Sequence, residues 1–338
     1  MTPNITASTM GHLLSRRGAI AAICAAPALA TRAFAETRWP RQPVKIIVGL
    51  PAGGGTDLLA RGLAPHLAAA FGQPFIVENL TGAGGNVAAA AVAHAGDGHT
   101  LGIVQGGPTT TAKVLNPMIS YDPQRDFKAV SLLTRVPFVL TVNPGSLPAA
   151  GFAAWLDHVR AQPGKLNYAS VGPGTVTHLA MEELKARLGI DLVHVPYRGF
   201  PPATLDLVAG RVQAMFNVPS TALEFIADGR LAALAQTGAA RLASLPAIPT
   251  LAEAGIRDAS FFGWAGMVAP AEFPDDTAMR LSEVMREALR ADPAARGGLD
   301  RAGNEMLGTP PAELAALQVS EAARWSTVIA RLGLTIQP

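Results

Sequence analysis

Short apolar runs alternate with amphipathic stretches along most of the chain. Between the runs lie stretches with helical periodicity, such as 56–71, where Leu59, Leu63, Leu67 and Phe71 recur every fourth residue. Strands that are apolar throughout and alternate with helices indicate parallel sheets covered on both faces. The pattern therefore predicts an α/β protein with parallel or mixed sheets, and its strand candidates are 44–50, 75–79, 100–106, 166–170, 192–197, 212–217 and 231–237.

Two extended runs, 130–149 and 259–270, interrupt this alternation. The segment between them has its own strand and helix pattern, which favours two lobes joined by two crossovers. We expect lobe 1 to comprise 36–140 and 260–338, and lobe 2 to comprise 141–259. Such a layout leaves a cleft between the lobes and allows them to close about the crossovers.

Two long helical patterns follow the second run, at about 274–292 and 309–333. No strand candidate follows them, so these helices have no sheet of their own to cover. We expect both helices to return to lobe 1 and to pack on it.

The N-terminal segment has the pattern of an export signal. Residues 1–35 contain no Asp or Glu, and they carry Arg16 and Arg17, then a short apolar run, then "AFA" at 33–35. This order predicts a secretory signal that is cleaved after Ala35 and a periplasmic location. "SRRGAI" also resembles a twin-arginine signal, so the export route stays open between the two general pathways.

Cleavage at this point changes the composition. It removes Cys24, the only cysteine, and three arginines, which leaves 24 basic and 25 acidic residues. The mature chain then has no thiolate metal site, no disulfide and no basic patch for nucleic acid. His94 and His99 lack the spacing of a zinc motif. We therefore expect no metal, no cofactor and no nucleic-acid partner.

A glycine loop follows the first strand candidate. In "GGGTD" (53–57) no lysine follows the glycines, so the phosphate loop of nucleotide-binding proteins is incomplete. The free N–H groups and the dipole of the helix that follows favour an anion, and without lysine a carboxylate is favoured over a phosphate. We predict that the amides of Gly53 and Gly54 bind this carboxylate. Asp57 either ties up a loop amide or contacts the ligand.

Similar loops follow the other strand candidates. Ligands of open parallel sheets bind beyond the carboxyl ends of the strands. Each loop alone is explained by turn chemistry, but together they predict one binding site that faces the cleft; they lie at 81–86, 105–111, 168–180, 195–203 and 216–220.

An enzyme is the alternative interpretation. Ser170 and His178 are eight residues apart, and together they suggest a secreted α/β hydrolase that cleaves an ester or an amide. However, Ser170 is not in the G-x-S-x-G turn of such enzymes. A receptor would bind its ligand without converting it.

Six stretches resemble one known family in the same order. They run from about residue 39 to the C-terminus and read "WPRQPVKIIVGLPAGGGTDLLAR", "GQPFIVENLTGAGGN", "YDPQRDF", "KLNYASVGPGTVTHLA", "VHVPYRG" and "PTLAEAG". The family is that of the Bug-type extracytoplasmic solute receptors, the binding proteins of tripartite tricarboxylate transporters.

The resemblance implies a periplasmic, monomeric, two-lobed binding protein of type II-like fold, without enzymatic activity. It implies that the cleft binds a small carboxylate, for uptake through the membrane subunits of such a transporter or for sensing. In lobe 1 the implied ligand contacts are Leu50, Ala52, Gly53, Gly54, Asp57, Gly106 and Thr109. In lobe 2 they are Ser170, Gly174, Thr175, His178, Tyr197, Arg198, Gly199 and Asn217.

Two positions depart from the family pattern. Members of the family often have an aromatic residue where Leu50 stands and an acidic residue near Asn217. Both positions shape the part of the pocket that selects the far end of the ligand.

Overall fold

The structure is a computed structural model that describes Met1 and residues 39–146 and 151–335. Its contacts separate a short N-terminal unit, 1–41, from one compact unit, 42–338, and the fold described below is that of the second unit. The predicted signal peptide, apart from Met1, lies outside the described residues.

Lobe 1 is built on a six-stranded mixed sheet with the order β11-β4-β10-β3-β1-β2. Helix α2 (Gly55–Phe71) packs on this sheet through the predicted apolar stripe, and its leucines 59, 63 and 67 are fully buried. Helix α3 (Asn86–Ala93) contacts β1, β3 and β10. The strands are β1 (Val44–Val48), β2 (Phe75–Asn79), β3 (Thr100–Gln105), β4 (Phe127–Pro137), β10 (Phe262–Pro270) and β11 (Glu305–Met306).

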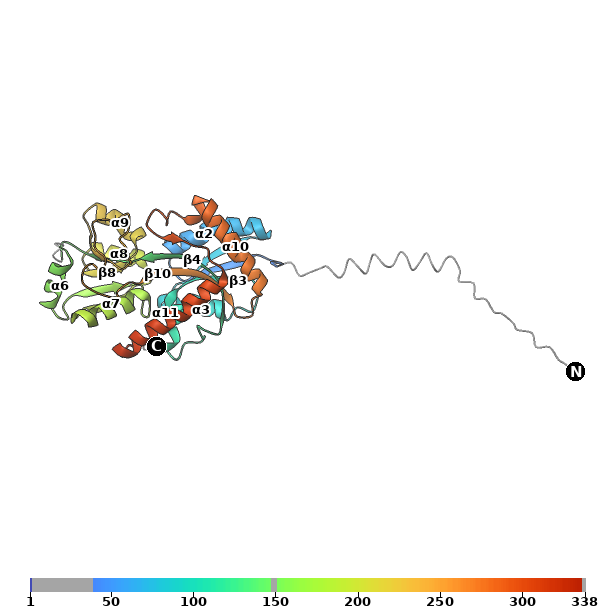
Figure 1. The fold of residues 1–338 in the computed structure, drawn as a ribbon, viewed down its shortest axis with the longest axis horizontal. Coiled ribbons are helices and arrows are strands. Elements are labelled where there is room, and N and C mark those ends of the chain that lie inside the picture. The colour runs from blue at the N-terminus through green and yellow to red at the C-terminus, as the bar shows by residue number, and fades with distance from the viewer. Residues whose placement is uncertain (2–38, 147–150, 336–338) are drawn as a thin grey trace. The chain divides into compact units, whose positions relative to one another are not determined.

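Lobe 2 is built on a five-stranded mixed sheet with the order β7-β6-β8-β5-β9. Figure 1 shows its helices on the side of the compact unit away from α2 and α10. The strands are β5 (Val139–Val142), β6 (Asn167–Ser170), β7 (Val193–Pro196), β8 (Ala214–Asn217) and β9 (Ala232–Gln236). The helices are α6 (Phe152–Arg160), α7 (Val176–Leu188), α8 (Phe200–Val208) and α9 (Pro219–Ala227).

Both sheets have the same internal order. Each sheet contains three neighbouring parallel strands, and the strand that comes first in the chain lies in the middle of them. The orders are β2-β1-β3 and β7-β6-β8. An antiparallel strand then follows in each sheet, β10 in the first and β5 in the second, and each comes from a crossover. The predicted two-lobed α/β fold with parallel and mixed sheets is thus confirmed.

The two crossovers lie side by side where the chain changes sheets. Phe138 alone separates β4 from β5. Its N–H donates to Thr237 Oγ1 at 2.8 Å, and that hydroxyl donates to the carbonyl of Phe261 at 2.7 Å. Thr237 is fully buried. One threonine therefore ties together the backbone of both crossovers.

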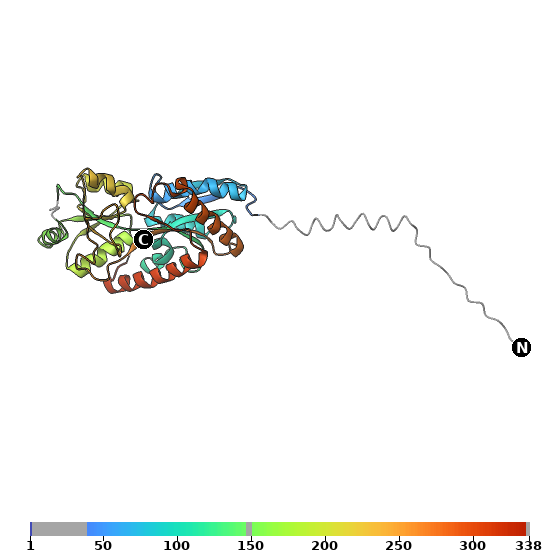
Figure 2. The same ribbon diagram turned by 45° about the horizontal axis from the view of Figure 1, so that its top comes forward.

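The two C-terminal helices behave differently. Helix α10 (Asp275–Ala291) packs on α2 and β4 of lobe 1, as predicted. Helix α11 (Pro311–Leu332) begins in the core of lobe 1 with Leu314 and ends in the core of lobe 2 with Trp325 and Ile329. It therefore packs on lobe 1, as expected, and also on lobe 2, which the sequence did not indicate. Figure 2 shows this red helix running along both lobes.

Among the helices of the described residues, none has both the length and the apolar character that crossing a membrane requires.

Candidate ligand-binding site

A cavity of about 100 Å³ lies between the two lobes. Its wall on the lobe 1 side is formed by Leu50, by Gly54–Thr56 at the start of α2, and by Gln105–Gly107. The last of these segments joins β3 to the short helix α4 (Gly106–Thr110). Two of the glycine-containing loops predicted at strand ends therefore form this wall.

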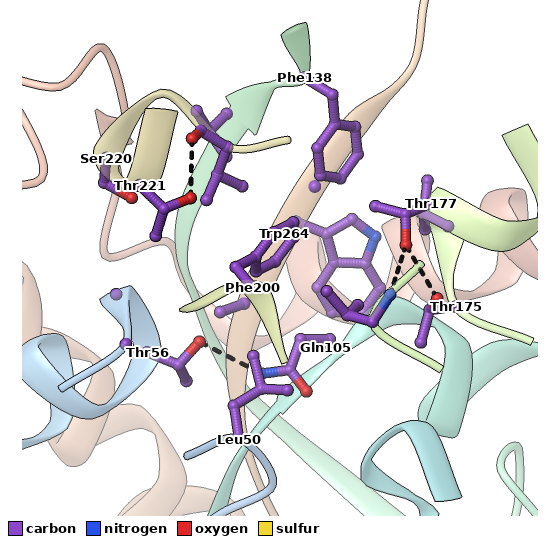
Figure 3. A pocket seen from close by; sticks show the side chains of 18 of the residues that line it. Leu50, Thr56, Gln105, Phe138, Thr175, Thr177, Phe200, Ser220, Thr221 and Trp264 are labelled. Carbon is purple, nitrogen blue, oxygen red and sulfur yellow. Dashed lines mark hydrogen bonds between the residues drawn. The ribbon is translucent and has the colours of Figure 1, made fainter. Parts of the chain in front are cut away.

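The wall on the lobe 2 side is also formed by helix starts. Thr175–Thr177 begin α7, Phe200 and Pro201 begin α8, and Ser220 and Thr221 begin α9. Figure 3 shows Thr56, Ser220 and Thr221 on one side of the cavity and Thr175 and Thr177 on the other. The cavity thus has two polar ends.

Aromatic side chains lie between these ends (Figure 3). Phe138 comes from the first crossover, Trp264 from β10 and Phe200 from α8. The rings of Phe138 and Phe200 stack with their centroids 6.3 Å apart. The middle of the cavity is therefore apolar, which suits the hydrocarbon part of a ligand.

The lining contains no Asp, Glu, Lys, Arg or His among the described residues. The first intrahelical donor of α2 is Leu58, whose N–H bonds to the carbonyl of Gly54 at 3.0 Å. The N–H groups of Gly55 and Thr56 consequently have no acceptor within the helix. Helices α2 and α7 each present such a start, with a partial positive charge, to the same cavity. Helix α9 differs, because it begins with Pro219 and the N–H of Thr221 bonds to the carbonyl of Val218 at 3.1 Å. The arrangement attracts an anion without any cationic side chain.

The Asp57 carboxylate holds the glycine loop in shape. It accepts hydrogen bonds from the Gly53 N–H at 2.9 Å, from Arg61 Nε at 3.0 Å and from Asn79 Nδ2 at 3.0 Å. Burial opposes its ionisation, but the hydrogen bonds from Arg61, Gly53 and Asn79 outweigh burial and lower the pKa of Asp57. Of the two roles left open for Asp57, the structure supports the tie to a loop amide.

The ligand contact of the two glycine amides stays a prediction, and their hydrogen bonds in the structure do not favour it. The Gly53 N–H bonds to Asp57, and the Gly54 N–H points to the carbonyl of Pro51 at 3.3 Å. Neither is free for a ligand, because the loop uses them to fold on itself. The next two residues, Gly55 and Thr56, line the cavity, and their N–H groups are candidates for the role that was predicted for Gly53 and Gly54.

Four of the predicted contact residues line the cavity, namely Leu50, Gly54, Gly106 and Thr175. Their contact with a ligand stays a prediction. The others are not among its lining residues; they are Ala52, Gly53, Asp57, Thr109, Ser170, Gly174, His178, Tyr197, Arg198, Gly199 and Asn217.

Asn217 is an example of a supporting residue. Its side chain is fully buried, donates to Thr204 Oγ1 at 2.9 Å and accepts from Thr221 Oγ1 at 2.6 Å. It therefore orients a hydroxyl of the wall rather than facing the cavity. Tyr197 likewise donates to Asp206 at 2.8 Å, and Arg198 is exposed.

Glycines bring the two lobes into direct contact around the cavity. A Cβ on Gly199 of lobe 2 would lie 2.7 Å from Pro51 Cδ of lobe 1, and one on Gly107 would lie 2.7 Å from the carbonyl oxygen of Gly174. Such distances are too short for carbon atoms in contact. The lobes approach this closely only because these positions lack side chains.

The serine and histidine of the hydrolase alternative do not pair. Ser170 Oγ lies 2.7 Å from His194 Nε2, whereas His178 Nδ1 accepts the N–H of Gly174 at 3.1 Å. Ser170 is fully buried, and none of these side chains lines the cavity. The predicted pairing is therefore wrong, and nothing here supports a hydrolase.

The two histidines stack in a buried cluster, with ring centroids 4.2 Å apart. Burial and the neighbouring His178 lower the pKa of His194 to about 3, and burial also lowers the pKa of His178. Their charged neighbours in the cluster are Glu182 and Lys185 of α7, and Glu182 also bonds to Tyr168. Both imidazoles are held in the neutral form in the folded protein.

This cluster predicts a loss of stability in weak acid. Between pH 6.5 and about 3 the unfolded chain protonates His194 while the folded chain does not, so the free energy of unfolding falls as the pH falls. Each histidine contributes at most about 1.4 kcal/mol per pH unit. Urea unfolding at pH 7 and pH 5 measures the slope. The variant His194→Phe keeps the stacked ring and should show a smaller slope, and an unchanged slope would contradict the prediction.

Several lining residues were not singled out from the sequence. Gln105, Thr177 and Ser220 lie within loops that were noted at strand ends, but Trp264 and Phe138 were not identified as site residues. The signal for Trp264 was its place among glycines in "FGWAG" (262–266), within an extended crossover. An aromatic residue flanked by glycines within a crossover indicates a residue that lines the cavity between the lobes.

Within the described part of the chain, no group of three or more His, Cys, Asp or Glu side chains is placed to hold a metal ion.

The fold and the cavity define a class: a two-lobed binding protein with its site between the lobes. The chain belongs to the tripartite tricarboxylate transporter family receptors, whose family model matches residues 59–334. It is 32% identical to the protein BugT of Bordetella pertussis over 301 residues, which cover 88% of this chain and 92% of BugT. The Bug-type resemblance is thus confirmed.

Two solved structures of this kind are described with bound acids. Rpa4515 of R. palustris, with adipate, has 32% sequence identity and a TM-score of 0.80, and the match covers 88% of this chain and 99% of that one. MatC of Rhodopseudomonas palustris, with malate, has 32% identity and a TM-score of 0.79, and the match covers 86% and 100%.

Proposed function

We propose that this protein is a periplasmic receptor that captures a small carboxylate between its lobes. It delivers the ligand to the membrane subunits of a tripartite tricarboxylate-type transporter or reports its presence to a sensor. It binds its ligand without converting it. Export by the N-terminal segment 1–35 is part of the proposal.

One observation carries the proposal. The starts of α2 and α7, one from each lobe, converge on a cavity whose described lining holds no ionised side chain. Helix starts with unpaired N–H groups favour anions, and a carboxylate needs no more than two or three such donors. The adipate and malate bound to two structural neighbours support an acid of similar size here.

A pair of variants at Gly55 tests the proposal. Gly55 is the first residue of α2, where proline is tolerated, and Gly54 before it has the extended conformation that precedes proline. Gly55→Pro removes one N–H from the cavity wall, whereas Gly55→Ala keeps it. A Cβ at this position would lie 3.1 Å from the mobile end of Leu299 in both variants, so that steric cost is shared.

We expect Gly55→Pro to bind a carboxylate at least about tenfold more weakly than Gly55→Ala, because a hydrogen bond to a charged group contributes roughly 1.5–3 kcal/mol. A thermal-shift screen with mono-, di- and tricarboxylates first identifies an acid that binds, and calorimetry then compares the variants. Equal affinity of the two variants would refute the role of α2. A wild-type protein that binds no carboxylate would refute the proposed function itself.

A further inference from the structure

The indole of Trp264 carries a buried donor that nothing in the protein uses. The side chain of Trp264 is 5% exposed, lines the cavity, and has no hydrogen-bond partner for its Nε1 among the described residues. A buried indole N–H normally finds an acceptor. A donor without a partner at the wall of a binding cavity indicates an acceptor on the ligand.

The ring is held in place by a glycine. A Cβ on Gly106 would lie 3.0 Å from both Cε2 and Nε1 of Trp264, so the indole lies directly against the backbone at the start of α4. Any side chain at residue 106 would displace the ring. The direction of the N–H is therefore fixed by packing and not by a hydrogen bond.

This donor faces the end of the cavity where α7 begins. Figure 3 shows the indole nitrogen of Trp264 on the side of Thr175 and Thr177. Gly107, which follows the glycine that packs against the ring, lies close to the start of α7, because a Cβ on Gly107 would lie 3.4 Å from Thr175 Cα. Strand β10 of lobe 1 and helix α7 of lobe 2 thus meet at one end of the cavity.

Helix α7 supplies further donors at this end. Its first intrahelical bonds run from the N–H groups of His178 and Leu179 to the carbonyl of Thr175, both at 3.0 Å. The N–H groups of Val176 and Thr177 therefore precede the helical pattern and have no acceptor within it. An indole from one lobe and helix amides from the other converge on the same space.

We propose that Trp264 is a specificity-determining residue, whose indole N–H binds a second carboxylate at the end of the ligand opposite α2. The inference rests on the proposed function. The amides of Val176 and Thr177 share this second carboxylate with the indole, so the ligand joins the lobes at this end. An ammonium group is disfavoured there, because the described lining offers it no carboxylate.

The test compares diacids with monoacids. The probes are the unbranched diacids from succinate to pimelate, each paired with the monoacid of equal chain length, measured by calorimetry on the wild-type protein and on Trp264→Phe. We expect the best diacid to bind the wild type at least about tenfold more tightly than its paired monoacid, or about 1.4 kcal/mol. In Trp264→Phe the diacid should lose more affinity than its paired monoacid, so this preference should largely disappear.

A second measurement needs no variant. The indole N–H resonance of Trp264 in a nitrogen-15 labelled protein should shift strongly with the diacid and little with the monoacid. The inference would be overturned if Trp264→Phe lost equal affinity for both acids, or if the indole resonance did not shift when the diacid was added. Neither result would contradict carboxylate binding. A wild-type protein that binds none of these acids would overturn the inference. If it bound no other carboxylate either, the proposed function would be overturned as well.

Discussion

Replacement of Gly199 by valine is expected to weaken carboxylate binding at least about a hundredfold while the protein stays folded. The backbone at Gly199 is extended, with φ 163° and ψ 176°, a conformation that any residue adopts. A side chain there would meet the rigid ring of Pro51 across the cleft, at 2.7 Å from Cδ. The lobes would be held apart, and the ligand would lose the donors of one lobe.

Calorimetry with a bound acid measures the affinity, and small-angle scattering measures whether the ligand still compacts the protein. Gly96→Val is the matched control, because Gly96 is exposed and no atom lies within 4 Å of a Cβ there. We expect wild-type affinity from this control. If Gly199→Val also bound and compacted normally, contact between the lobes at this point would not matter for binding.

Replacement of Asp57 by alanine is expected to lower the free energy of unfolding by about 3 kcal/mol. Asp57 is 2% exposed and accepts hydrogen bonds from Gly53, Arg61 and Asn79. Its removal would leave the amide of Gly53 and the side chain of Asn79 without their buried acceptor. The glycine loop would lose the tie that shapes the cavity wall.

Urea unfolding at pH 7 measures this loss. Asp275→Ala is the control, because Asp275 is 84% exposed in its pair with Lys128, and exposed pairs contribute less than about 1 kcal/mol. A loss for Asp57→Ala no larger than that of the control would show that the loop keeps its shape without the carboxylate.

The strands and most helices could be predicted from the sequence because their signals are local. The run 75–79 matches β2 residue for residue, and the predicted helix 56–71 differs from α2 by one residue at its start. Helix α11 was harder, since a single amphipathic pattern does not tell which lobe covers each half of it. Its later residues, such as Trp325, pack on lobe 2, and contacts between segments so distant in sequence leave no local signal.

The site was predictable in its chemistry but not in its individual contacts. Glycine loops at strand ends pointed to backbone donors, and the cavity has them. The sequence pointed to the amides of Gly53 and Gly54 because it does not reveal that Asp57 turns back to Gly53. Trp264 was missed because it reaches the cavity from a strand that is distant in sequence from the glycine loops.

The absence of ionised side chains from the described cavity lining has a further consequence. Peptide dipoles do not titrate, and salt screens buried charges much less than exposed ones. Affinity would then depend on the ionisation of the ligand and little on the salt or acidity of the medium. The fraction of receptor that is occupied at a given solute concentration would then be similar at low and at high salt concentration.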